Sequence, residues 1–99
     1  MKLVFGSDHA AFSLRQVLAE LMVAAGHDVA EVGAPSEDSY DYPDASDLVA
    51  EAVLGGTAER GVLLCGSGIG VSIRANRYPG IRAALCTTPQ LAELARAHN

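Results

Sequence analysis

Short apolar runs alternate along the chain with longer segments of helical periodicity. Four runs predict strands, at residues 2–5, 28–32, 61–65 and 81–86. Apolar residues at three- and four-residue steps predict helices over 14–25 and 45–53, after the glycines at 66–70, and from Pro89 onward. The run at 61–65 has no polar interruption, which is typical of a strand covered on both faces.

Residues typical of helix ends support these elements. Gly26 follows the first helical segment, where a C-terminal cap is expected, and Thr88-Pro89 combines a hydroxyl cap with a proline in the first turn. Alternating strands and helices imply right-handed crossovers and a parallel sheet covered on both sides. We therefore expect one α/β domain over residues 1–99, with a Rossmann-like three-layer α/β/α architecture. In such sheets, ligands bind beyond the carboxyl ends of the strands.

Composition excludes several classes of protein. The net charge is −5 and the seven Lys and Arg residues are scattered, which argues against a nucleic-acid surface. No apolar stretch approaches the roughly 20 residues that cross a bilayer. Cys65 and Cys86 form no CxxC pair, and no signal peptide precedes them, so we expect reduced thiols in the cytoplasm.

The glycine loop, residues 65–70 (Cys-Gly-Ser-Gly-Ile-Gly), is the most informative segment. Its glycines let successive amides face one concavity, which suits a phosphate or an oxyanion formed during a reaction. A tight turn without a ligand explains the glycines equally well. Cys65 is either a thiolate base or nucleophile, activated beside those amides, or a small residue at a strand end. Cys86 fits the second description better.

Other polar residues are less specific on their own. Asp8 and His9 pair a carboxylate with an imidazole, yet on their own they fit better as a helix cap and a solvated first-turn residue. The acidic residues of the 37–44 segment lack calcium-loop spacing, so we predict no metal site. Arg74 and Arg77 either attract an anion or lie in water.

Taken together, five segments resemble the ribose-5-phosphate isomerase B family, which includes the galactose-6-phosphate isomerase subunits. They are GSDHA at 6–10, DYPD at 41–44, CGSGIGVSIRANR at 65–77, GIRAALC at 80–86 and the terminal AHN. The resemblance covers nearly the whole chain. It implies an aldose-ketose isomerase that acts on a phosphorylated sugar, needs no metal or cofactor, and works as a homodimer or dimer of dimers with active sites at the subunit interface.

The resemblance also implies roles for individual residues. Cys65 would be the base that moves a proton between C1 and C2, and the Ser67 hydroxyl would assist transfer between the two sugar oxygens. The amides of Gly66, Gly68, Ile69 and Gly70 would stabilise the enediolate. His98, helped by Asp8, would open the furanose ring. His9 would contact the phosphate, Asn99 would bind near the enediolate or the ring oxygens, and Tyr42 would line the pocket.

One feature departs from the family pattern. Family members continue past the His-Asn pair with a further strand, a long helix and phosphate-binding arginines, whereas this sequence ends at Asn99. We therefore expect a C-terminally truncated domain that lacks the family's last strand and helix. Ribose 5-phosphate and ribulose 5-phosphate are the expected substrates. A six-carbon sugar phosphate (allose or galactose 6-phosphate) and a non-catalytic sugar-phosphate binding module remain alternatives.

Overall fold

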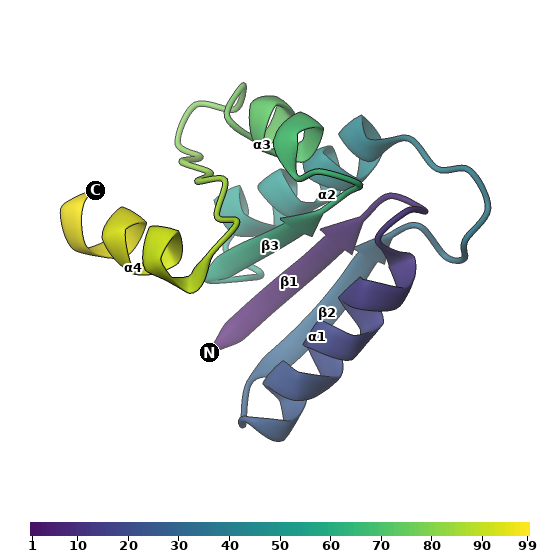
Figure 1. Ribbon diagram of the computed structural model, residues 1–99, viewed down its shortest axis with the longest axis horizontal. Helices are drawn as coiled ribbons and strands as arrows, with labels where there is room; N and C mark the ends of the chain where they lie inside the picture. Colours follow the sequence, from purple (N-terminus) through teal and green to yellow (C-terminus); the bar gives the residue numbers. More distant parts are fainter.

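A three-stranded parallel sheet in the order β2-β1-β3 forms the centre of the molecule (Figure 1). The structure is a computed structural model that describes all 99 residues. The strands are β1 (Lys2–Ser7), β2 (Asp28–Gly33) and β3 (Arg60–Leu64). The helices are α1 (Phe12–Ala24), α2 (Tyr42–Leu54), α3 (Ile69–Ala75) and α4 (Pro89–His98). Helix α1 covers one face of the sheet, and α2 with α3 covers the other, so the predicted three-layer arrangement is confirmed.

The predicted helix ends are confirmed. Gly26 follows α1 with φ of +94°, a left-handed conformation that glycine adopts without a steric penalty. At α4, the Thr88 hydroxyl oxygen accepts a hydrogen bond from the Leu91 amide at 3.2 Å, and Pro89 occupies the first turn. These local signals therefore determine where the two helices stop and start.

The hydrophobic core lies between the sheet and α2. Val4, at the centre of β1, is 2% exposed and packs with Val49 of α2 and with Ala58. Because β1 is paired on both sides, Leu3, Val4 and Phe5 are all buried. This burial holds β1 rigidly in the middle of the sheet.

The strand register brings the carboxyl ends of all three strands together. Ser7 is paired with Gly33 on one side and with Leu64 on the other. The residues that follow, Asp8 and Cys65 among them, therefore start from the same edge of the sheet. This is the edge at which a parallel α/β sheet binds its ligands.

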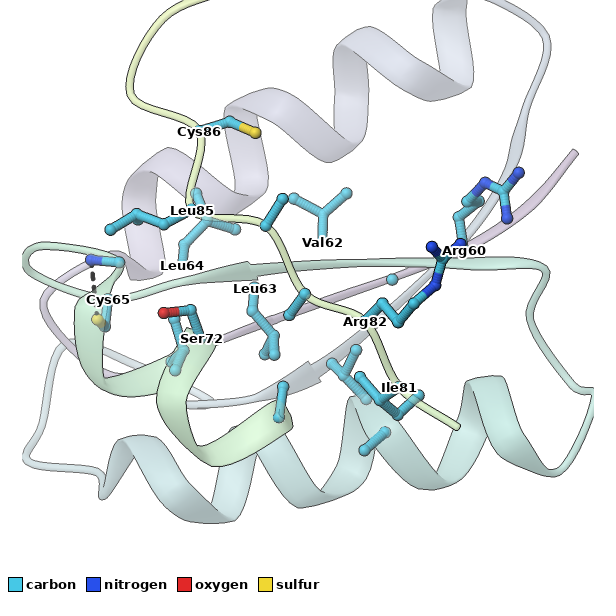
Figure 2. A pocket seen from close by; sticks show the side chains of 18 of the residues that line it. Arg60, Val62, Leu63, Leu64, Cys65, Ser72, Ile81, Arg82, Leu85 and Cys86 are labelled. Atoms are coloured by element: carbon cyan, nitrogen blue, oxygen red, sulfur yellow. Dashed lines mark hydrogen bonds between the residues drawn. The ribbon is translucent and has the colours of Figure 1, made fainter. Parts of the chain in front are cut away.

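The predicted fourth strand at residues 81–86 is wrong. No backbone hydrogen bond joins this segment to β3; instead, the Asn76 side chain binds the amide and the carbonyl oxygen of Ala83, at 2.7 and 2.8 Å. A cavity of about 820 Å³, lined by both segments, separates them (Figure 2). The expectation that residues 61–65 are covered on both faces is also wrong, because β3 is packed mainly by α2 and α3 on one face and Val62 to Leu64 are only half-buried.

Helix α4 forms as predicted but buries no residue. Leu91 and Leu94, on its predicted apolar face, are about half exposed. None of the helices has both the length and the apolar character that a membrane crossing needs.

Candidate active site

Cys65 lies immediately after β3, at the carboxyl edge of the sheet. Its sulfur accepts a hydrogen bond from the Gly68 amide at 3.1 Å, drawn as the dashed line in Figure 2. Asp8, which follows β1, donates its amide to the Leu64 carbonyl oxygen, so its main chain is held beside Cys65. The Asp8 carboxylate is buried and accepts a hydrogen bond from the Ala11 amide at 3.2 Å. The N-cap of α1 is Ala11, without a side-chain cap hydrogen bond, so the alternative that Asp8 caps this helix is wrong; the Asp8 carboxylate instead binds the turn that precedes α1.

The surroundings of the Cys65 sulfur act in opposite directions on its pKa. Partial burial raises the pKa of the thiol, because it disfavours the charged form. The amides of Val71, Ser67 and Gly68 each lower the pKa by hydrogen bonding to the sulfur, while the Asp8 carboxylate raises it. The net result is a pKa below the ordinary value for cysteine. The amides of the glycine loop thus point toward the thiol itself.

The rest of the glycine loop is arranged around that sulfur. The Ser67 hydroxyl oxygen accepts a hydrogen bond from the Ile69 amide at 3.2 Å and is solvent-exposed. Gly68 has φ of +80°, a conformation that L side chains rarely adopt. The amides of Gly66 and Gly70 have no acceptor within the chain, so two donors remain for a ligand.

Tyr42 packs directly against the end of this loop. A Cβ atom at Gly70 would lie 2.7 Å from the Tyr42 ring, so the glycine is needed for the ring to approach the backbone. Tyr42 is the first residue of α2 and its side chain is 41% exposed. The ring therefore flanks the glycine loop with one part of its surface still open to a ligand.

His9 is half-buried and faces the loop that follows β2. Its ring nitrogen Nδ1 lies 3.1 Å from the amide nitrogen and 3.2 Å from the carbonyl oxygen of Tyr40. The sequence alone indicated no partner for this ring. The contact joins the end of β1 to the 34–41 loop.

Arg15 is a site component that the sequence analysis missed. It is buried under the carboxyl ends of β1 and β2, where it donates hydrogen bonds to the Ser7 hydroxyl at 3.0 Å and the Val32 carbonyl oxygen at 2.9 Å. It also forms an ion pair with Glu31 at 3.1 Å. The available signal was a single arginine inside the apolar face of the first predicted helix. Arg15 ties together the two strand ends from which the Asp8 and Tyr40 segments leave.

Within this chain, His98 and Asn99 are not brought to the carboxyl edge. They close α4, and Figure 1 places the C-terminus on the side of the amino ends of the strands. Arg82 donates a hydrogen bond to the main-chain oxygen of Asn99. The structure thus separates His98 and Asn99 from Cys65 and Asp8, although the resemblance assigned all four to one site.

Arg74, the exposed arginine of α3, is engaged by a partner within the chain. Arg74 forms two hydrogen bonds to the Asp47 carboxylate, at 2.7 and 3.1 Å, and these bonds lower the pKa of Asp47, together with a hydrogen bond from Tyr78. Arg74 is therefore occupied by an internal partner. No group of three or more His, Cys, Asp or Glu side chains comes together in a way that would hold a metal ion.

The arrangement favours proton transfer on an anionic substrate. A thiol whose pKa is lowered by three amides stands at a ligand-binding edge, beside a buried carboxylate, a hydroxyl and two unoccupied amide donors. A thiolate of this kind serves as a base or nucleophile, and free amides stabilise a developing oxyanion. Fold and site together define a Rossmann-like α/β protein with a thiol-based candidate active site.

Comparison with known proteins gives the family. Residues 3–99 match the Ribose/Galactose Isomerase family, and the chain belongs to it. Ribose-5-phosphate isomerase B from Escherichia coli (strain K12) is 43% identical over 98 residues, covering 99% of this chain and 66% of that protein. D-erythrulose-4-phosphate isomerase from Pectobacterium atrosepticum is 36% identical over 100 residues, covering 100% of this chain and 66% of that protein.

A solved structure agrees with the fold. Ribose-5-phosphate isomerase B from Clostridium thermocellum superposes with a TM-score of 0.97 at 44% identity, over 99% of this chain and 66% of that one. The Rossmann-like α/β class expected from the sequence is therefore confirmed. The chain spans about two thirds of the length of these relatives.

Proposed function

We propose that this chain carries the proton-transfer site of a sugar-phosphate isomerase that interconverts ribose 5-phosphate and ribulose 5-phosphate. The observation that carries the proposal is the Cys65 sulfur, which accepts the Gly68 amide at 3.1 Å and has a lowered pKa at the ligand-binding edge of the sheet. Membership of the Ribose/Galactose Isomerase family supports the same reaction class.

In the proposed reaction, the Cys65 thiolate removes the C2 proton of the open-chain aldose. The electrons of the C–H bond form the C1–C2 double bond of an enediolate, and the former carbonyl oxygen takes up the negative charge. The proton of the C2 hydroxyl passes to the C1 oxygen, and the protonated Cys65 returns its proton to C1 as the C2 carbonyl forms, which completes the ketose. Removal of a proton beside a carbonyl requires that this charge be stabilised as it develops.

The remaining groups of the loop suit this chemistry. The amides of Gly66 and Gly70 have no partner in the chain and supply donors for the enediolate oxygens. The Ser67 hydroxyl, which is exposed, would pass a proton between those oxygens. Because three amides lower the pKa of Cys65, they favour its thiolate form, while weakening it somewhat as a base.

A second copy of the chain is part of the proposal. His98 and Asn99 lie away from the Cys65 edge within one chain, so they would open the sugar ring and bind the substrate only at the site of another copy. A homodimer with sites at the subunit interface meets this requirement.

The identity of the sugar is a separate part of the proposal. One relative is a D-erythrulose-4-phosphate isomerase, and the family description includes galactose, so four- and six-carbon sugar phosphates are the competing substrates. Pocket depth discriminates among chain lengths, and the comparison to make is kcat/KM for sugar phosphates of four, five and six carbons.

The experiment follows deuterium exchange at C2 and ketose formation by NMR, with ribose 5-phosphate in D2O. It uses the full open reading frame and residues 1–99 alone. Cys65→Ala should lower kcat by roughly a hundredfold to ten-thousandfold, the usual contribution of a general base. Cys86→Ala is the matched control, because Cys86 is a free, exposed thiol, and this variant should retain wild-type kcat.

Three outcomes would change the proposal. If the wild-type protein binds ribose 5-phosphate but neither exchanges nor isomerises it, the protein is a sugar-phosphate binding module. If Cys65→Ala keeps the wild-type exchange rate, another group is the base. Turnover that is rapid only with a four- or six-carbon sugar phosphate would retain the chemistry and replace the substrate.

A further inference from the structure

His9 is held by the loop that follows β2, and this contact determines which ring nitrogen is free. Nδ1 lies 3.1 Å from the amide nitrogen of Tyr40 and 3.2 Å from its carbonyl oxygen. The same loop is tied to α1 at a second point, where the Ser13 hydroxyl donates to Glu37 at 2.9 Å. The 34–41 loop is therefore held at two side-chain contacts, one to His9 after β1 and one to Ser13 of α1.

The two Tyr40 groups make opposite demands on Nδ1. The amide can only donate, so it requires an unprotonated Nδ1, whereas the carbonyl oxygen requires an N–H. Both groups are partly buried. A partly buried amide without an acceptor is rarer in proteins than an under-satisfied carbonyl oxygen, which has two lone pairs and accepts from water more easily. The amide contact therefore dominates, and in a neutral ring the proton is on Nε2.

We propose that the Tyr40 amide selects the Nε2–H tautomer of His9, so that Nε2 is the donor available for the phosphate contact that the family resemblance implies for this residue. The 34–41 loop then has a defined task, which is to orient the imidazole. The substrate half of this inference rests on the proposed function, but the tautomer does not.

The consequence is a division of work between the two ring nitrogens. Nδ1 serves the protein, because it accepts from the main chain and fixes the ring plane. Nε2 is then free to donate a hydrogen bond to the ligand. A protonated ring would instead donate from Nδ1 to the Tyr40 carbonyl oxygen and leave the Tyr40 amide without its acceptor.

The first test is direct and needs no activity. Long-range ¹H–¹⁵N correlation spectra of the full ¹⁵N-labelled protein at pH 8.5 distinguish a protonated from an unprotonated ring nitrogen. His9 should show Nε2 protonated and Nδ1 bare, with its signals assigned by their loss in His9→Asn. A proton on Nδ1 of His9 would overturn the inference.

Two substitutions separate the roles of the nitrogens. His9→Asn keeps an oxygen acceptor near the position of Nδ1, and His9→Gln keeps an amide donor near the position of Nε2. Hydrogen exchange of the Tyr40 amide should stay at the wild-type rate in His9→Asn and become roughly tenfold faster in His9→Gln. KM for ribose 5-phosphate should rise roughly tenfold to a hundredfold in His9→Asn and much less in His9→Gln.

The control is Ser13→Ala, which removes the other contact of the same loop. It should leave the His9 tautomer and KM unchanged. Equal KM effects for the Asn and Gln variants would contradict the division of roles. If the wild-type protein has no turnover, the proposed function fails, while the imidazole spectra and the Tyr40 exchange rate still decide the tautomer.

Discussion

Replacing Arg15 with Met should destabilise the fold by about 2–4 kcal/mol. Met retains most of the apolar stem of arginine and removes only the guanidinium. That group donates to the Ser7 hydroxyl at 3.0 Å and to the Val32 carbonyl oxygen at 2.9 Å, at a position only 5% exposed. The substitution therefore tests whether this guanidinium ties the ends of β1 and β2 together.

The magnitude comes from the acceptors that lose their donor. Ser7 is fully buried at 0% exposure, and an unsatisfied buried polar group costs about 1–3 kcal/mol. Two such acceptors give a loss of about 2–6 kcal/mol. The ion pair with Glu31 adds at most about 1 kcal/mol, because the Glu31 side chain is 38% exposed. Relief from burying a charge returns part of this loss, which leaves about 2–4 kcal/mol.

Urea denaturation followed by circular dichroism measures the effect. For a domain of this size the transition midpoint should fall by roughly 1–3 M, and Tm by at least about 8 °C. Arg77→Met is the matched control, because Arg77 is exposed and makes no side-chain hydrogen bond in the chain, and its effect should stay within about 0.5 kcal/mol. If Arg15→Met loses no more stability than this control, the proposed tie between the strand ends is refuted.

Three further predictions concern the loop geometry, the thiol and a surface ion pair. Gly33→Ala should lower the unfolding free energy by more than about 2 kcal/mol in the same urea assay, because φ is +92° there and a Cβ would lie 2.5 Å from the Ser7 carbonyl oxygen; a loss below about 1 kcal/mol would contradict this. Alkylation of Cys65 by iodoacetamide can be measured across pH by peptide mass spectrometry. Because amides lower the pKa of Cys65, the inflection of the rate with pH should lie below about 8.5, the pKa of a free cysteine, and an inflection at or above 8.5 would exclude a stabilised thiolate. Because Arg74 lowers the pKa of Asp47, this carboxylate stabilises the fold by up to about 1 kcal/mol above pH 4, and this contribution is lost as pH falls through the folded-state pKa. Asp47→Asn should therefore be less stable than wild type at pH 6, and a difference that persists at pH 2 would argue against this origin.

Local patterns predicted the elements that depend on neighbouring residues. Gly26 ends α1 because a left-handed residue is needed there, and Thr88 caps α4 with its own hydroxyl. The predicted link between Cys65 and the glycine loop is also local, because the sulfur and the Gly68 amide are only three residues apart. Such features follow from a few consecutive residues.

Features that depend on distant partners could not be predicted in this way. The apolar pattern of residues 81–86 suits a strand, yet a strand forms only where a neighbouring backbone is within hydrogen-bonding distance, and a cavity separates this segment from β3. In the sequence, Arg15 is only a charged residue on an apolar helix face; its partners, Ser7 and Val32 at the strand ends, are brought to it by the fold. The Tyr40 partner of His9 is 31 residues away in sequence.

By itself, the sequence determined the α/β class, the order of the first three strands and of the helices, and the presence of a thiol beside a glycine loop, because periodicity, caps and turns act over a few residues. The tertiary structure decided which amides surround Cys65, which buried cation supports the strand ends, and where His98 lies. Those relations depend on strand register and packing, which bring together groups far apart in the chain. Only their arrangement in space turns a reactive residue type into a candidate active site.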